Sequence, residues 1–189
     1  DRVCSVGLVL LDAGADDAYR NSAAMPDVPP PLDCPVRDFG VTGRDVRVVD
    51  GAYSDDPEAV GPPELLVWMR YRDRPAEEYL HAALLAQATT HYTIAASMRP
   101  HRGITEAMAH VTLSTGPMKV DIAFHDEGDV TDWHLYENPA IYAGRGHVQG
   151  LGRVFAEDGR LVASYAVHAM VRAATTDLGT TAGGYTSAM

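Results

Sequence analysis

The alternation of apolar and polar residues predicts β-strands in six segments of this sequence. In residues 64–72 the apolar side chains fall at every second position, which is the period of a strand with one buried face: Leu65, Val67, Met69 and Tyr71. Four later segments are also predicted as strands, at residues 118–125, 131–141, 147–156 and 160–172. The last two are joined by Glu157-Asp158-Gly159, and Asp-Gly between apolar runs is a strong hairpin signal.

One long segment, residues 77–98, has the period of a helix. Pro75 precedes it, and Glu77 and Glu78 suit the positive end of a helix dipole. Mostly apolar or small side chains recur at helical spacing, namely Leu80, Leu84, Ala88, His91, Ile94 and Met98. Pro100 then ends the helix. A single long helix among antiparallel strands predicts an α+β fold in which the helix packs on a curved antiparallel sheet.

The first third of the chain has a different pattern. Residues 3–11 are apolar on both strand faces, so we predict a strand buried on both sides that pairs with polypeptide outside residues 12–189. Residues 23–61 are rich in proline and glycine, and the run at 25–31 excludes both a helix and a central strand, which predicts a stiff linker. Residues 174–189 consist mainly of Thr, Gly and Ala, and we expect a flexible tail.

Composition and charge exclude several classes of protein. The net charge of -11 disfavours nucleic acid as a partner, because phosphate binding needs clustered cations. The apolar runs are far shorter than the roughly 20 residues that cross a bilayer. Cys4 and Cys34 are the only cysteines, so we expect reduced thiols, a cytoplasmic location and no disulfide framework. We find no metal-ligand spacing and no phosphate-binding glycine loop, so no metal and no cofactor is expected.

Four groups of residues between 62 and 172 form a recognisable set. The first group is residues 80–86 with Arg99-Pro100-His101, and the second is Phe124-His125 with Trp133 eight residues after His125. The third group is residues 143–146, and the fourth is residues 152–155 with 158–164. In this order and at this spacing they resemble the C-terminal hotdog of the acyl-CoA thioesterase II family, whose members contain two hotdog domains. Residues 24–31 also resemble the segment that joins the two domains in that family.

The resemblance has consequences for domains, activity and partners. It implies that residues 62–173 form the C-terminal hotdog, and that residues 1–22 carry the last strand of a first hotdog that is otherwise absent from this sequence. It implies a thioester hydrolase of lipid metabolism that hydrolyses or binds fatty acyl-CoA or acyl-carrier thioesters. It also implies oligomers built through hotdog sheets, with the missing N-terminal portion as a further partner.

The residues that the family uses for catalysis are replaced in this chain. Thioester hydrolysis needs a water, a group that orients or deprotonates it, and donors for the developing oxyanion. The resemblance places the family's Asp, hydroxyl and Gln positions at Lys119, Ile141 and Val167. Isoleucine and valine offer no hydrogen bond, and an ammonium group is a poor substitute for a carboxylate base. Asp121 shares a strand face with Lys119 and is the candidate base, although a surface Lys119–Asp121 ion pair is the alternative interpretation.

Four other residues are weaker candidates. His91 lies among the apolar positions of the helix, where a buried structural imidazole is as plausible as a base. His168 is expected on the opposite strand face from Val167, and so away from the family's site. His125 is part of the resemblance, and a structural role is the commoner interpretation for it. Tyr142 offers a hydroxyl, but aromatic packing is the commoner use of tyrosine.

Three hypotheses about function remain open at this point. The first is a working thioesterase with a relocated site, in which weak hydrolysis depends on Asp121. The second is a catalytically impaired relative that binds acyl-CoA or an acyl carrier, or that supports a partner subunit. The third is an enzyme that modifies a secondary metabolite and uses the hotdog cavity for a different reaction. All three stay open because a fold alone does not decide function.

Overall fold

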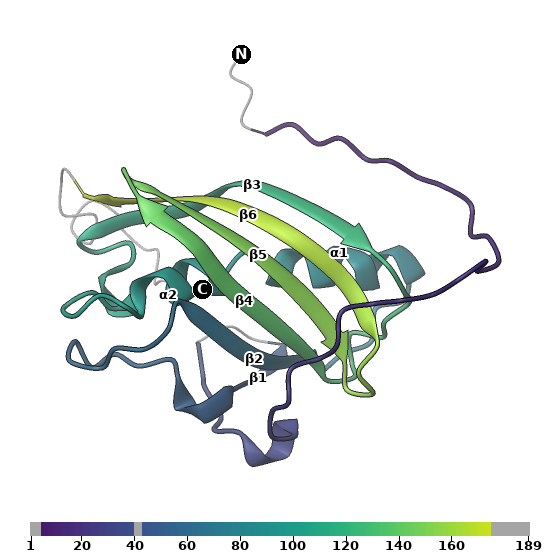
Figure 1. Ribbon diagram of the computed structural model, residues 1–189, viewed down its shortest axis with the longest axis horizontal. Helices are drawn as coiled ribbons and strands as arrows, with labels where there is room; N and C mark the ends of the chain where they lie inside the picture. Colours follow the sequence, from purple (N-terminus) through teal and green to yellow (C-terminus); the bar gives the residue numbers. More distant parts are fainter. Residues whose placement is uncertain (1–4, 40–42, 175–189) are drawn as a thin grey trace.

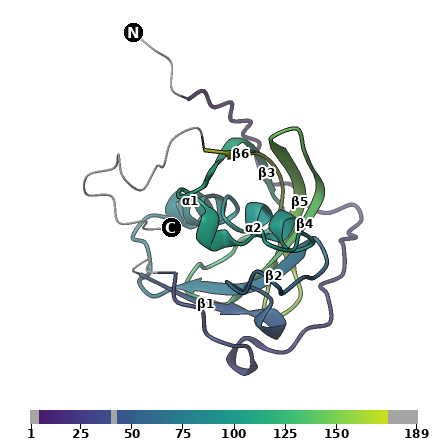
Figure 2. The same ribbon diagram turned by 90° about the vertical axis from the view of Figure 1, so that its left-hand side faces the viewer.

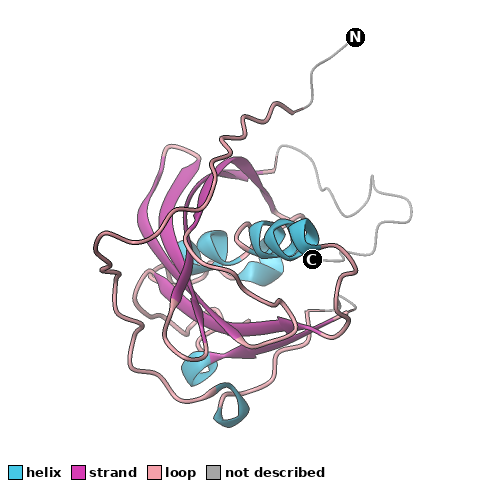
Figure 3. Ribbon diagram, turned by 90° about the vertical axis from the view of Figure 1, so that its right-hand side faces the viewer, coloured by secondary structure: helices cyan, strands magenta, loops and turns pink. Residues whose placement is uncertain are grey.

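The computed structural model describes residues 5–39 and 43–174. Six antiparallel strands form one sheet in the order β1-β2-β4-β5-β6-β3, and the sheet curves around two helices (Figures 1 and 3). The strands are β1 (Arg44–Val48), β2 (Glu64–Tyr71), β3 (Leu113–Phe124), β4 (His134–Gly144), β5 (His147–Ala156) and β6 (Leu161–Ala173). The helices are α1 (Glu78–Ala88) and α2 (Tyr92–Met98), and short 3-10 turns lie at 31–33, 49–51 and 106–108. The predicted α+β arrangement is therefore confirmed.

The predicted long helix is divided into two by a turn at residues 89–91. The hydroxyls of Thr89 and Thr90 donate hydrogen bonds to the carbonyls of Ala86 and Gln87, at 2.8 and 3.0 Å. Such bonds from a side chain to the preceding turn compete with continuation of the helix. All seven residues of α2 are buried, whereas α1 buries only three, namely His81, Leu85 and Ala88. The second helix therefore supplies most of the contact between the helical layer and the sheet.

Most strand predictions are confirmed within a few residues. The bounds of β5 are those predicted, and Gly159 forms the predicted hairpin with a positive φ of 90°. The strand β3 begins at Leu113, earlier than expected, and has a register shift between Pro117 and Lys119. Proline has no amide proton to contribute to the ladder, which accounts for an irregularity at this point.

The segment predicted as a linker contains the strand β1, which the sequence pattern did not predict. Its buried positions alternate with half-buried ones, but the first buried position is Arg44 rather than an apolar residue. Two arginines and an aspartate among five residues conceal the alternation. The strand pairs with β2 along its whole length and extends the sheet at that edge.

The rest of the linker covers one end of the outer face of the sheet, and Figure 1 shows the chain crossing in front of the strands there. The Trp68 indole donates a hydrogen bond to the carbonyl of Pro29 at 3.0 Å. Linker residues pack on a second apolar cluster made of Cys34, Val49, Trp68, Trp133, Leu135 and Phe155. The linker is therefore a packed part of the domain at this end.

The predicted strand at residues 3–11 is wrong for the part that the structure describes. Residues 5–11 are not in a strand, and their apolar side chains are highly exposed, as for Val6 at 89% and Leu10 at 90%. Pairing of this segment with polypeptide outside the sequence stays a prediction. Residues 3 and 4 and the expected tail at 175–189 lie outside the described residues. Among the helices described, none is long and apolar enough to cross a membrane.

Two strand glycines allow close packing inside the domain. A Cβ on Gly150 of β5 would collide with the side chain of Thr93 in α2 and lie 3.0 Å from the carbonyl oxygen of Pro139 in β4. A Cβ on Gly152 would collide with the ring of Tyr165. The helix α2 therefore rests almost directly on the backbone of β5.

Candidate functional site

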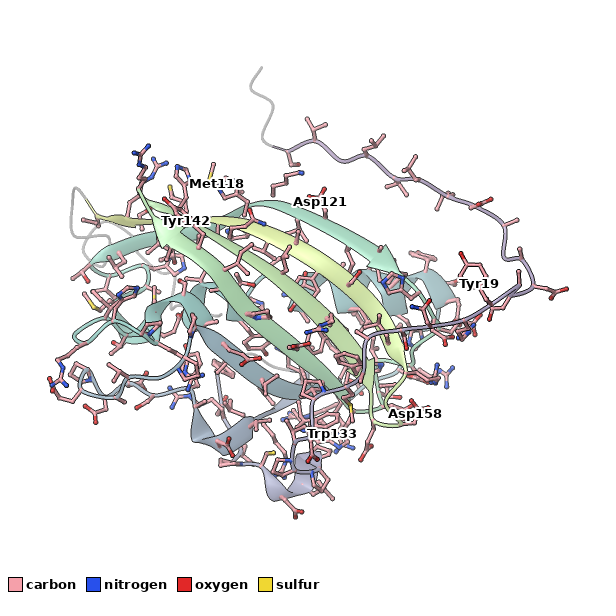
Figure 4. All side chains as sticks on the ribbon, in the orientation of Figure 1. Tyr19, Met118, Asp121, Trp133, Tyr142 and Asp158 are labelled. Carbon is pink, nitrogen blue, oxygen red and sulfur yellow. The ribbon has the colours of Figure 1, made fainter. Side chains whose placement is uncertain are left out.

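Asp121 lies on the outer face of the sheet, away from the helices (Figure 4), and Lys119 is exposed beside it on the same strand. The Lys119 Nζ atom is 2.7 Å from the Asp121 carboxylate, and their side chains are 67% and 62% exposed. The alternate residues Val120 and Ile122 pack against the main core instead. The surface ion pair of Lys119 and Asp121, given above as the alternative interpretation, is therefore what the structure shows. Asp121 borders a cavity on the outer face together with Ile141 and Arg153.

The three positions aligned with the family's catalytic residues do not come together. Val167 is completely buried on the inner face, within the main core. Ile141 is 59% exposed, and Lys119 is exposed on the outer face. A single reactive group cannot contact all three side chains in this arrangement.

The remaining candidates on the strands also lie apart from one another. The His168 ring is 5.2 Å from the ring of His147. Tyr142 is half exposed on β4. The Nε2 atom of His125 is 2.8 Å from the Ser164 hydroxyl, a hydrogen bond that ties the end of β3 to β6. The geometry of His125 thus fits a structural role.

His91 lines a cavity together with several other ionisable groups. It precedes α2 at the helix break, and its Nε2 atom is 3.2 Å from the Gln87 amide nitrogen. Burial, together with the nearby charge of Arg44, lowers the pKa of His91 to about 4. The imidazole is therefore neutral at pH 7 and is a weak base.

The cavity beside His91 has a volume of about 390 Å³ and is lined by β1, the start of α2 and the loops at 37–39, 53–55 and 106–111. Figure 2 looks at the end of the molecule where β1 and α2 lie. The aromatic wall of this cavity includes the buried Tyr92, together with Phe39 and Tyr53, whose ring centroids are 4.9 Å apart. A smaller neighbouring cavity of about 140 Å³ shares Tyr53 and Glu106. Apolar walls with a few polar groups are typical of small-molecule sites.

Glu106 is an unusual carboxyl group in this cavity. Its Oε1 atom is buried and has no hydrogen-bond partner among the described residues. Burial raises the pKa of Glu106 to about 7; a hydrogen bond from Tyr53 acts in the opposite direction, and the charge of Asp55 raises it slightly. A carboxyl group that titrates near neutrality inside a cavity is suited to accept a proton from a substrate or a water.

Two arginines line the same cavity, and only one of them forms an ion pair within the described chain. Arg37 forms an ion pair with Asp55 at 2.8 Å and lies 4.8 Å from the centroid of the Tyr53 ring. Arg44 is only 7% exposed and forms no ion pair with a carboxylate of the described chain. Its Nη1 atom contacts the Gln87 amide oxygen at 3.4 Å, while its Nε atom has no partner in the described part.

Glu106 and Arg44 were not identified from the sequence. Glu106 lies in a short 3-10 turn without periodicity, and Arg44 lies in the strand concealed by its charges. Arg44 lies two and four residues before the apolar Val46 and Val48, and this spacing is the sequence signal that could have indicated its burial.

Comparisons with known proteins agree with this architecture. The family described as the acyl-CoA thioesterase C-terminal domain matches residues 21–171. Acyl-CoA thioesterase 2 of Haemophilus influenzae is 25% identical over 114 residues, which are 59% of this chain and 38% of that protein. The crystal structure of the acyl-CoA thioesterase II TesB2 from Mycobacterium marinum is similar with a TM-score of 0.65 and 26% identity, over 85% of this chain and 60% of that one.

A hotdog-fold protein of unknown function from Alicyclobacillus acidocaldarius has a TM-score of 0.60 at 23% identity, over 85% of this chain and 59% of that one. The fold is therefore a hotdog, as expected. The chain belongs to the acyl-CoA thioesterase C-terminal domain family. It spans 38% of the length of its curated relative and 60% of the Mycobacterium marinum protein.

Proposed function

We propose that this protein hydrolyses acyl-CoA thioesters and that the reaction takes place in the cavity beside Glu106. The observation that carries the proposal is the family match over residues 21–171, and the two thioesterases named above support it. Glu106 supplies the chemistry that the aligned positions lack, because its pKa of about 7 suits a general base at neutral pH.

The proposed reaction is a simple hydrolysis. The Glu106 carboxylate takes a proton from a water whose oxygen attacks the thioester carbonyl carbon. The tetrahedral intermediate then collapses, the carbon–sulfur bond breaks, and Glu106 returns the proton to the departing thiolate. The Tyr53 hydroxyl lines the same cavity and is an available donor for the oxyanion.

Glu106→Gln is expected to lower kcat on an acyl-CoA panel by about 10²-fold or more, because Gln cannot accept the proton. In the unmodified protein kcat should rise as the pH passes through about 7, where Glu106 ionises, and this rise should be absent in the variant.

Glu157→Gln, in the exposed β5–β6 hairpin, is the matched control and should behave as the unmodified protein. A variant Asp121→Ala separates this proposal from a base on the outer face. Loss of turnover in Asp121→Ala, with turnover retained in Glu106→Gln, would refute the proposal.

A second candidate function is the binding of acyl-CoA without hydrolysis. It is favoured by Lys119, Ile141 and Val167 at the aligned catalytic positions, since none of them reproduces the chemistry of the residue it replaces. Saturable binding of acyl-CoA without release of free CoA, at any pH from 6 to 9, would establish this alternative.

We also propose that two copies associate through the outer face of their sheets. The part of this face left uncovered by the linker exposes Met118, Ile141, Tyr142 and Leu151, each at least half exposed. Large exposed apolar patches are uncommon on monomers. We expect light scattering to give at least twice the 20.3 kDa of one chain, and Ile141→Lys to reduce it to one chain. A monodisperse monomer before substitution would contradict this prediction.

A further inference from the structure

The guanidinium of Arg44 is a buried cation that has no anionic partner among residues 5–39 and 43–174, and it lines the 390 Å³ cavity. We infer that this cavity binds the carboxylate of a small organic acid, with Arg44 as the residue that receives it. The free energy of removing a guanidinium from water is unfavourable, and it is normally offset by a carboxylate or by several strong hydrogen bonds.

The partners of Arg44 within the domain are weak. Its Nη1 atom meets only the Gln87 amide oxygen, at the long distance of 3.4 Å, and the Met69 sulfur at 3.9 Å. Arg44 also forms a hydrogen bond with the Tyr71 hydroxyl, and the hydroxyls of Tyr71 and Tyr92 stay protonated because burial raises the pKa of each. The histidine beside it is the neutral His91. None of these groups neutralises the charge of Arg44.

The other charged groups of the cavity are already engaged or partly neutral. Arg37 and Asp55 neutralise each other at 2.8 Å. Glu106 is partly protonated at pH 7 because burial raises its pKa to about 7. Asp38 also lines the cavity and is engaged in an interaction of its own. Arg44 is thus the charge in this cavity that a ligand can neutralise.

A carboxylate is the anion that fits this environment best. The planar guanidinium presents parallel N–H donors that match two carboxylate oxygens. An apolar part of the wall, which includes Phe39, Ala109 and Val111, would hold a short hydrocarbon body. The carboxylate could belong to a free acid or to the far end of an acyl chain. The second source depends on the proposed thioesterase function, whereas the first does not.

The test uses isothermal titration calorimetry with hexanoate and its neutral analogue hexanamide. We expect the unmodified protein to bind hexanoate at least about tenfold more tightly than hexanamide, since a charge-assisted hydrogen bond is stronger than a neutral one. Arg44→Met should lose this preference. The matched control is Arg72→Met, which removes an exposed arginine paired with Asp45 and should retain it.

Thermal unfolding separates a ligand site from a structural role for Arg44. Methionine replaces the unbranched stem of arginine and removes an unneutralised buried charge, so Tm of Arg44→Met should be unchanged or higher. A fall in Tm together with unchanged hexanoate binding would overturn the inference. Equal affinity for hexanoate and hexanamide would overturn a free acid as the source of the carboxylate.

A second pair of probes, adipoyl-CoA and hexanoyl-CoA, distinguishes the two sources of the carboxylate. Tighter binding of adipoyl-CoA that depends on Arg44, without binding of hexanoate, identifies the end of an acyl chain. Hexanoate binding without any difference between the two thioesters identifies a free acid. Absence of Arg44-dependent binding for both hexanoate and adipoyl-CoA refutes the inference, whether or not the protein hydrolyses thioesters.

Discussion

Substitution of Gly150 by alanine is expected to destabilise the domain by about 3 kcal/mol, because the new methyl group has no space. It would collide with the side chain of Thr93 in α2 and lie 3.0 Å from the Pro139 carbonyl oxygen. The helix α2 is buried along its whole length, so it cannot retreat from β5 without opening the core. Urea unfolding at pH 7 measures the loss as a lower midpoint with an unchanged slope.

The chain offers a matched control and a rescue for this substitution. Gly116 lies in β3, and a Cβ there would meet nothing within 4 Å, so Gly116→Ala should change stability by less than about 1 kcal/mol. The double variant Gly150→Ala/Thr93→Ala removes the atoms that collide and should recover part of the loss. Equal effects of Gly150→Ala and Gly116→Ala would show that the close approach of α2 has no energetic importance.

The second large effect concerns the pH dependence of stability, and it is expected for Glu106→Gln. Burial raises the pKa of Glu106 from 4.5 to about 7, so the folded state binds this proton more tightly than the unfolded state. The associated stability is fully present below pH 4.5 and is lost as the pH rises toward 7. Such a shift corresponds to a loss on the order of 2–3 kcal/mol.

Glutamine has no proton to lose, so the variant should be more stable than the unmodified protein at pH 8 by about this amount and similar to it at pH 4.5. The measurement is the free energy of unfolding at several pH values from 4.5 to 8 for both proteins. The lowered pKa of His91 acts in the opposite direction, removing stability as the pH falls from 6.5 toward 4. Because His91 is present in both proteins, the difference between them isolates Glu106. A constant difference across this range would contradict the prediction.

The sequence predicted the parts of the fold that depend on local alternation. Regular apolar spacing and the Asp-Gly turn were sufficient for β5, β6 and their hairpin. The strand β1 was missed because Arg44 occupies a buried position, and the helix break was missed because it depends on hydroxyl bonds from Thr89 and Thr90. The strand β1 and the helix break depend on side-chain contacts, and the spacing of apolar residues does not reveal such contacts.

The candidate site was predicted less well than the fold. His91 was selected because it lies at a helical position, and it does line a cavity. Asp121 lies in a surface ion pair with Lys119, which was the alternative interpretation from the sequence. The properties of Glu106 and Arg44 arise from burial beside residues far away in the sequence, such as Tyr53 and Gln87. No local pattern reports the pKa of a carboxyl group or the absence of a counterion.

The division of the helix at residues 89–91 gives the domain two levels of local stability. The fully buried α2 can separate from the sheet only when the core itself opens, so its unfolding is coupled to that of the whole domain. The helix α1 has only three buried residues and can fray at a lower free-energy cost. His91, which lines the cavity, stands at the boundary between these two units. One wall of the cavity is therefore fixed by the core, while the helix leading to it retains freedom of movement.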